Sequence, residues 1–278
     1  MMDTDTPFAA EGREIAALVK GKASDEEIQP VIERIHALAL DNNLDPLVAS
    51  TDVFVTAVLH VGSKSLSHVL AAIERTKDRL TDAGAASEAA RAQIISAVMA
   101  YWGSHPGVAI AIVEKLLNYS ILVPAAVINW ALVTYAGATK GSALARAHIY
   151  ELVFNTVIKV TGRVRQIAQK ATQPDAMIDN DTKDAEAGSM RELFRAMEDA
   201  LVSWASGNKD EMMEMEIGDG EGKSQREALV RRWGERWLRV FRRRAAIEEA
   251  FLLEISKRAA VSGNESGAAV DGEVEEVL

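Results

Sequence analysis

The chemically most distinctive part of this sequence is a run of tryptophan and arginine residues between positions 232 and 243. Both side-chain types can stack on nucleic-acid bases, and both also anchor protein interfaces. Three interpretations remain open: the Trp face packs into the core beneath solvated arginines, it binds a partner protein, or it stacks on RNA. The candidate partner-binding residues are Arg232, Trp233, Arg236, Trp237, Arg239 and Arg243.

The charge of the whole chain ranks these interpretations in the order given. The formal net charge is −10 over 278 residues. Since phosphate binding depends on Lys and Arg neutralising a polyanion, this acidic balance argues against a surface that grips nucleic acid throughout. Any RNA contact is therefore expected to be local or indirect.

Four oxygen-bearing side chains are spaced like part of a calcium loop. Asp41, Asn43 and Asp45 match its first three ligands, and Asp52 falls at the twelfth position. Pro46 stands where the loop needs glycine, and the twelfth ligand is normally a bidentate Glu. We interpret the segment as a turn between helices.

Other possible catalytic patterns are incomplete. Residues 137–142 (GATKGS) resemble a phosphate-binding loop, but Lys140 precedes the second Gly and no strand leads in, so a turn and helix cap is expected. The five histidines lack the spacing of a zinc site, and no nucleophile-elbow pattern occurs. The sequence predicts no enzyme activity, cofactor or metal. The histidines are His36, His60, His68, His105 and His148.

Cysteine usage and hydropathy indicate a soluble intracellular protein that does not associate with membranes. The chain contains no Cys, which suits a reducing compartment. It shows no secretory signal and no run of eighteen apolar residues. A short basic nuclear-import signal is also missing.

Apolar residues recur three and four positions apart, the period of amphipathic helices. Ser24 with Glu27 forms a predicted capping box, Pro30 is expected to kink the helix that follows, and Gly62 is expected to end the next one. The predicted helices cover about 24–40, 46–61, 65–82, 87–102, 105–118, 123–135, 142–170, 189–205 and 224–260. The second and third should pack antiparallel.

We expect a flexible N-terminus over 1–11 and one helical domain over 12–260. Acidic linkers are predicted at 172–188 and 208–222, and a disordered acidic tail at 261–278. Further capping boxes are predicted at Ser189–Glu192 and Ser224–Glu227. The last helix is expected to carry one broad apolar face formed by Leu229, Trp233, Trp237, Val240, Ile247, Phe251 and Ile255.

The predicted fold class is all-α, a superhelical stack of antiparallel helical hairpins of the HEAT-like kind. Hairpins of roughly 35–45 residues would each cover the apolar face of a neighbour. Such a stack is a scaffold for binding partners.

Several segments, in their shared order and spacing, resemble a known family. They are 20–28 (KGKASDEEI), 53–60 (VFVTAVLH), 64–68 (KSLSH), 102–106 (WGSHP), 112–116 (IVEKL) and 125–130 (AAVINW). Over roughly residues 8–170 the chain resembles the C-terminal helical domain of the large subunit of the nuclear cap-binding complex, and fungal-type members look most similar.

The resemblance implies a helical domain like the middle domain of initiation factor 4G. It also implies a nuclear scaffold, shuttling to the cytoplasm, that holds a small RNA-recognition-motif subunit and contacts capped RNA only through it. Recruited factors for splicing, export, decay and surveillance would be further partners. The animal members' charged coiled-coil insertion is replaced here by a shorter acidic segment after Lys170. The alternative is a generic helical protein-interaction module in RNA metabolism or translation.

Overall fold

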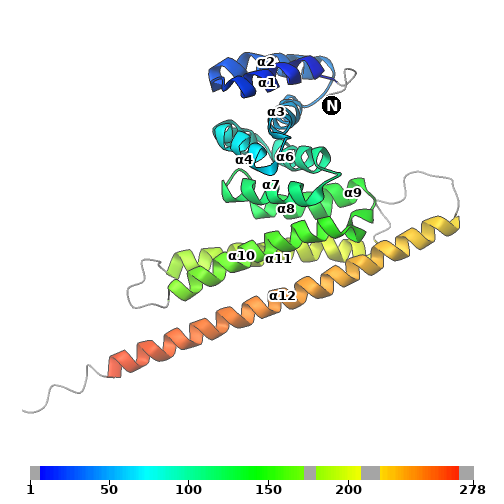
Figure 1. Ribbon diagram of the computed structural model, residues 1–278. Helices are drawn as coiled ribbons and strands as arrows, with labels where there is room; N and C mark the ends of the chain where they lie inside the picture. The colour runs from blue at the N-terminus through cyan, green and yellow to red at the C-terminus, as the bar shows by residue number, and fades with distance from the viewer. Residues whose placement is uncertain (1–6, 172–179, 208–219, 269–278) are drawn as a thin grey trace, which may run out of the picture. The chain divides into compact units, whose positions relative to one another are not determined.

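The computed structural model describes residues 7–171, 180–207 and 220–268, and within them every regular element is a helix, which confirms the predicted all-α class (Figure 1). The elements are α1 (Ala9–Gly21), α2 (Asp25–Asp41), α3 (Pro46–Gly62), α4 (Leu66–Arg75), α5 (Lys77–Ala86), α6 (Glu88–Tyr101), α7 (Pro106–Asn118), α8 (Pro124–Asn129), η1 (Trp130–Tyr135), α9 (Ala136–Ala138), η2 (Ser142–Ala145), α10 (Ala147–Lys170), α11 (Asn180–Ser206) and α12 (Gly220–Ala268).

The chain divides into two compact units, where the sequence predicted one domain. Unit 1 comprises residues 1–135 and 146–156, and unit 2 comprises residues 136–145 and 157–278. Helix α10 begins in unit 1 and ends in unit 2.

Unit 1 is a stack of short helices in chain order (Figure 1). Helix α3 packs on α1, α2, α4 and α6, and α6 packs in turn on α5, α7 and α8. Their shared core is mainly aliphatic, with Phe54 of α3 also buried, so burial of branched side chains stabilises the stack. Its fully buried members include Ile15, Ile35, Leu59, Ile73, Leu80, Ile94, Ile95, Ile112 and Leu116.

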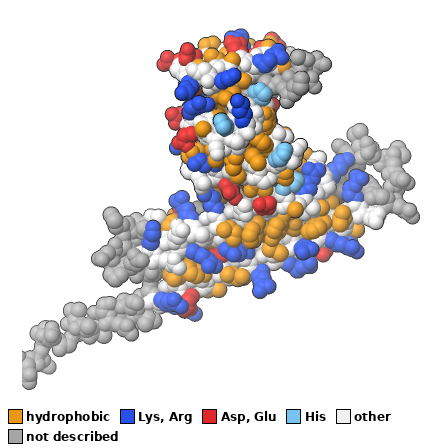
Figure 2. Space-filling model, viewed as in Figure 1, with side chains coloured by type: hydrophobic (Ala, Val, Ile, Leu, Met, Phe, Trp, Pro, Cys, Tyr) orange, Lys and Arg blue, Asp and Glu red, His pale blue; other side chains and the backbone are white. Residues whose placement is uncertain are grey.

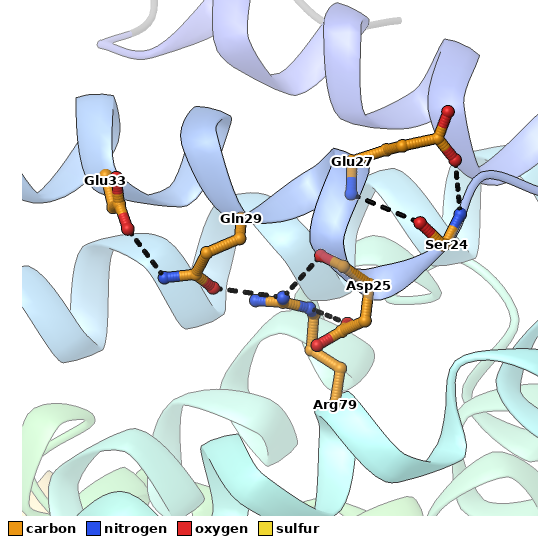
Figure 3. Close-up of polar contacts among 6 residues, drawn as sticks. All are labelled: Ser24, Asp25, Glu27, Gln29, Glu33 and Arg79. Atoms are coloured by element: carbon orange, nitrogen blue, oxygen red, sulfur yellow. Dashed lines mark hydrogen bonds and ion pairs between the residues drawn. The ribbon is translucent and has the colours of Figure 1, made fainter.

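Side-chain caps begin several of these helices, and the one at Ser24 lies where the sequence predicted it. In the Ser24–Glu27 capping box, the Ser24 amide donates to Glu27 Oε2 at 2.7 Å and the Glu27 amide to Ser24 Oγ at 3.4 Å (Figure 3). Asp45 accepts from the amides of Leu47 and Val48 at the start of α3. Each cap satisfies backbone donors that the helix itself cannot reach.

Arg79 of α5 links this first capped helix to a later part of the chain. Its guanidinium forms an ion pair with Asp25 and donates to the Asp25 carbonyl at 3.0 Å and to Gln29 Oε1 at 3.1 Å. Gln29 donates onward to Glu33 at 3.2 Å, so four polar residues form one connected network (Figure 3). The network joins residues about fifty positions apart on the surface of unit 1.

Two boundaries in unit 1 differ from prediction. The helix expected over 65–82 is broken at Thr76, whose hydroxyl donates to the Ala72 carbonyl at 3.0 Å and so competes for the helical hydrogen bond. The helix also continues past the predicted end at residue 82: α5 extends to Ala86 through Gly84, where an added Cβ would sit 2.7 Å from the Ile121 carbonyl oxygen. Glycine at position 84 thus allows α5 to lie close to the backbone at Ile121.

The helix predicted over 123–135 changes geometry partway. After α8 the chain widens into the π-helix η1. Within it the Trp130 and Tyr135 rings stack with centroids 4.9 Å apart, and Trp130 Nε1 donates to Ser96 Oγ at 2.8 Å. The wider turn coincides with this stacked pair at the end of the first segment of unit 1.

Unit 2 consists mainly of long helices, and it departs further from prediction. A 3-10 turn, η2, precedes α10 where one continuous helix was expected. Residues 180–188 are helical, so that part of the predicted linker is wrong, and the Ser189–Glu192 capping box is wrong because Ser189 lies inside α11. Burial of Ala187 and Met190 explains why this helix begins earlier.

Helix α12 also extends beyond its predicted ends. It begins at Gly220, before the expected Ser224–Glu227 capping box, and continues to Ala268, into the segment expected to be a disordered tail. The N-terminal helix α1 likewise begins at Ala9, inside the segment expected to be flexible. Residues 172–179, 208–219 and 269–278 of the predicted linkers and tail lie outside the described residues.

Candidate partner-binding surface

All six candidate residues lie on α12, but they differ in exposure. Trp237 is 1% exposed and meets Phe241 edge to face, with ring centroids 6.2 Å apart. Trp233 is half-buried. The four arginines, Arg232, Arg236, Arg239 and Arg243, are exposed. The structure therefore assigns one tryptophan to the core and leaves the other at the edge of a basic surface.

Two glycines allow α12 to lie close to other elements of unit 2. At Gly234 an added Cβ would sit 2.9 Å from the Ala205 amide nitrogen of α11. Gly141, with a φ of 78°, lies so close to α12 that an added Cβ would sit 2.4 Å from Val230 Cγ1. These close approaches determine which side of α12 is buried.

The buried side of α12 differs from the broad apolar face that the sequence predicted. Of the seven predicted residues only Trp237 is buried, while Leu229, Val240 and Ile247 are exposed. The buried apolar side chains are Val230, Trp237, Leu238, Phe241 and Leu252. Helix α12 thus has two apolar faces, and periodicity alone does not indicate which of them packs on α11.

Sequence reasoning also missed a buried carboxylate on this helix. Glu248 is 1% exposed and receives Arg165 of α10 through two hydrogen bonds, at 2.6 and 3.1 Å. Arg244 pairs with the same carboxylate at 2.7 Å and donates to Thr161 Oγ1 at 3.1 Å. The ion pairs with two guanidinium groups offset the free-energy cost of removing the Glu248 carboxylate from water. The cluster fixes the rotation of α12 relative to the C-terminal part of α10.

Exposed ion pairs connect α12 to α11 on either side of this cluster. Arg191 donates to both oxygens of Glu249, at 2.7 and 3.0 Å, and these hydrogen bonds raise the pKa of Arg191 above its ordinary value. Arg242 pairs with Glu198 at 2.6 Å. Arg242 is therefore paired, whereas the four candidate arginines form no ion pair with any residue that the structure describes.

The apolar side chains beside these arginines form a defined surface, here called the α12 stripe. Its members are Leu229, Trp233, Val240, Ile247 and Phe251, at intervals of four and seven residues that place them on one side of the helix. Leu229 is 50% exposed, Ile247 45% and Val240 38%. In Figure 2 hydrophobic side chains gather over the long helices of unit 2, with Lys and Arg along the band.

The patterns that resembled small-ligand sites have structural roles. Asp45 caps α3, and Asp52 accepts a hydrogen bond from Gln93 at 2.7 Å. In the 137–142 segment, Thr139 Oγ1 accepts from the Ala143 amide at 3.2 Å, as expected for a turn and cap. Across the described ranges, no group of three His, Asp or Glu side chains is placed to hold a metal ion.

The histidines are held by separate contacts. His36 is hydrogen-bonded to Ser50 at 2.9 Å, and His68 to Ser65 at 2.7 Å. Burial, together with the nearby charge of Arg146, lowers the pKa of His148 and favours its neutral form. The histidines therefore do not form a shared centre in the described structure.

A hollow between α11 and α12, lined by Lys183, Arg191 and Glu249 among others, holds about 90 Å³. This is well below the ~300–1,000 Å³ typical of small-molecule sites. The described helices also include none long and apolar enough to span a bilayer. The α12 stripe with its arginines is thus the feature of unit 2 best suited to binding a macromolecule.

These observations define a helical-repeat protein with an exposed basic and apolar surface on α12. The chain matches the family model described as MIF4G like over residues 2–250, and it belongs to that family. This membership confirms the predicted fold and the likeness to the middle domain of initiation factor 4G.

Curated relatives support the more specific resemblance. The chain is 27% identical over 156 residues to nuclear cap-binding protein subunit 1-A of Xenopus laevis, covering 55% of the chain and 19% of the relative. It is 24% identical over 209 residues to nuclear cap-binding protein subunit 1 of Gallus gallus, covering 69% of the chain and 26% of the relative. It is 26% identical over 192 residues to nuclear cap-binding protein subunit 1 of Aedes aegypti, covering 69% of the chain and 22% of the relative.

The chain spans about a fifth to a quarter of the length of these relatives. The family match identifies it as a helical protein, as the sequence predicted. The predicted likeness to fungal-type members stays a prediction.

Proposed function

We propose that this chain is a scaffold domain of the large subunit of a nuclear cap-binding complex, supporting a small RNA-recognition-motif subunit that binds the cap. The family match over most of the chain, with relatives named nuclear cap-binding protein subunit 1, is the observation that carries the proposal. The stacked hairpins of unit 1 offer the extended surface that such a role requires.

The mechanism is preorganisation. A rigid helical surface that holds the small subunit in its cap-binding conformation reduces the entropy lost when cap binds, so affinity rises without contact between the scaffold and the cap. Capped RNA is then bound indirectly, which agrees with the net charge of −10. The complex would act in the nucleus, shuttle to the cytoplasm, and recruit factors for splicing, export, decay and surveillance.

The test mixes the full chain with the small cap-binding subunit of the same organism. Association is measured by isothermal titration calorimetry at two salt concentrations, and cap-analogue affinity is measured for the mixture and for each protein alone. We expect association and tighter cap binding by the mixture than by the small subunit alone. Absence of association would contradict self-sufficient scaffolding by this chain.

A second candidate is a generic helical protein-interaction module in RNA metabolism or translation. It is favoured by the low identity, 24–27%, between the chain and these relatives. This alternative predicts that cap-analogue affinity stays the same with and without the chain.

A further inference from the structure

The α12 stripe and its arginines combine two features that seldom remain uncovered together. Leu229, Val240 and Ile247 expose large apolar side chains, although α12 already buries a separate apolar face. Contiguous exposed apolar surface marks interaction sites on folded proteins. The stripe extends over residues 229–251, about 33 Å of helix at 1.5 Å per residue, which is long enough to receive several turns of a partner helix.

The charge of this helix is opposite to that of the chain. Across the stripe, residues 229–251, there are seven arginines and three glutamates, whereas the whole chain carries −10. At 100° per residue, Arg232, Arg236, Arg239 and Arg243 follow one row on the solvent side of the stripe. Since none of them pairs with a described acidic residue, the row is available to carboxylates of another molecule.

The surface chemistry favours a protein over RNA as the occupant. Base stacking requires open aromatic faces, but Arg236 lies over the Trp233 ring at 5.3 Å and Arg165 over the Phe251 ring at 4.7 Å. The exposed aliphatic side chains offer nothing for a base to stack on. They match instead the apolar face of an amphipathic helix.

We propose that the α12 stripe binds an acidic amphipathic helix of a partner protein. Its apolar side chains cover Leu229, Val240 and Ile247, and its carboxylates pair with the arginine row, where guanidinium–carboxylate bonds add both energy and register. This proposal rests on the scaffold function above and specifies the chemistry of one class of recruited partner.

The test uses a defined probe, a fluorescent peptide of about 21 residues with Leu at helical intervals of three and four and Glu on the opposite face. Its scrambled version has the same composition without the apolar face. Binding to the full chain is measured by fluorescence anisotropy at two salt concentrations. A single-stranded RNA of similar length is titrated in parallel.

Two variants of the full chain disrupt the two features of the surface separately. Ile247→Glu interrupts the apolar stripe, and the double variant Arg239→Glu with Arg243→Glu reverses part of the arginine row. Controls are Val202→Glu, matched to Ile247→Glu, and the single charge reversal Arg195→Glu, both at exposed positions on α11. Circular dichroism checks that each variant folds like the parent chain.

We expect the amphipathic peptide to bind, with affinity lowered at least about tenfold by either test variant and little changed by the controls. Added salt should weaken binding to the parent chain more than binding to the double arginine variant. Equal binding of the scrambled peptide, or unchanged affinity in both test variants, would overturn the proposal.

Two other occupants would show distinct results. RNA binding tighter than peptide binding, lost in the same variants, would assign the surface to RNA. Dimerisation in sedimentation experiments that Ile247→Glu abolishes would assign it to a second copy of the chain. Small-subunit association, measured on Ile247→Glu and the parent, separates the two proposals, because its absence in both contradicts the scaffold function without bearing on peptide binding.

Discussion

Unit 1 consists of short helices with side-chain caps around an aliphatic core, whereas unit 2 consists of long helices cross-linked by arginine and carboxylate side chains. In unit 1, Ser24, Asp45, Ser65 and Ser87 each cap a helix. In unit 2 the Glu248 cluster and the Arg191 and Arg242 ion pairs connect α12 to its neighbours.

This difference separates local from tertiary determinants of structure. A cap is formed by residues three positions apart, so it acts wherever its helix packs. The ion pairs that connect α12 to α10 and α11 join residues 44 to 83 positions apart, so they form only after the long helices have met. Unit 1 should therefore respond to local substitutions, and unit 2 to substitutions in its few long-range contacts.

The largest expected effect is at the buried tryptophan of unit 2. Trp237→Ala should lower the free energy of unfolding by about 4 kcal/mol, because it leaves a large cavity beside Phe241. Trp233→Ala, at a half-buried site on the same helix, should cost about 1 kcal/mol. Urea denaturation followed by circular dichroism measures both. Equal losses would show that the two tryptophans contribute alike to the core.

The Glu248 cluster tests whether unit 2 depends on long-range pairing. Glu248→Gln should cost about 3 kcal/mol, because it leaves Arg165 and Arg244 close together without their shared counter-charge. The neighbouring change Glu249→Gln disrupts the exposed pair with Arg191 and should cost less than about 1 kcal/mol. The same denaturation experiment measures both losses in the free energy of unfolding. Similar losses for the two variants would show that burial of Glu248 does not increase its contribution.

In unit 1 a single methyl group should disrupt the contact between α3 and α4. At Gly62 an added Cβ would lie 2.4 Å from Val69 Cα, so Gly62→Ala should destabilise the chain by about 2 kcal/mol. At Gly162 of α10 nothing lies within 4 Å, and Gly162→Ala should stabilise by up to about 1 kcal/mol through helix propensity. Thermal unfolding should show melting shifts of opposite sign, and shifts of the same sign would refute the steric explanation.

Two serines with the same sequence pattern give the finest comparison between the units. Ser24→Ala removes a cap in unit 1 and should cost about 1 kcal/mol. Ser189→Ala, at an exposed site inside α11, should be neutral or stabilising by a few tenths, roughly 0.3 kcal/mol, because alanine favours helix. Denaturant midpoints measure the difference. A loss at Ser189 as large as that at Ser24 would mean that its hydroxyl has a structural role.

Local signals explain which parts of the fold were predictable. The capping box at Ser24, Pro46 after the Asp45 cap, and Pro106 mark helix starts that the structure confirms. Helix breaks were less predictable: at Thr76 a hydroxyl hydrogen bond interrupts a pattern whose apolar spacing continues. The Ser189 pattern predicts a cap incorrectly, because burial of Met190 and Ala187 extends the helix through it.

The candidate surface was predictable in position but not in exposure. Arginine and tryptophan spacing located all six residues on one helix, since spacing depends only on helical geometry. It could not show that Trp237 is buried while Trp233 is only half-buried, because α12 carries apolar residues on two faces. Likewise, nothing in the sequence distinguishes Glu248 from the exposed Glu249 beside it.

The sequence by itself determined the helical class, most helix starts in unit 1, the family resemblance and the basic character of α12, since these follow from residue type and spacing along the chain. Only the tertiary structure decided the division into two units, the extended start of α11 and the face of α12 that remains exposed. The physical reason is that burial depends on close approach between distant segments, as at Gly234 and Gly141, where the absence of a side chain allows contact that periodicity cannot indicate.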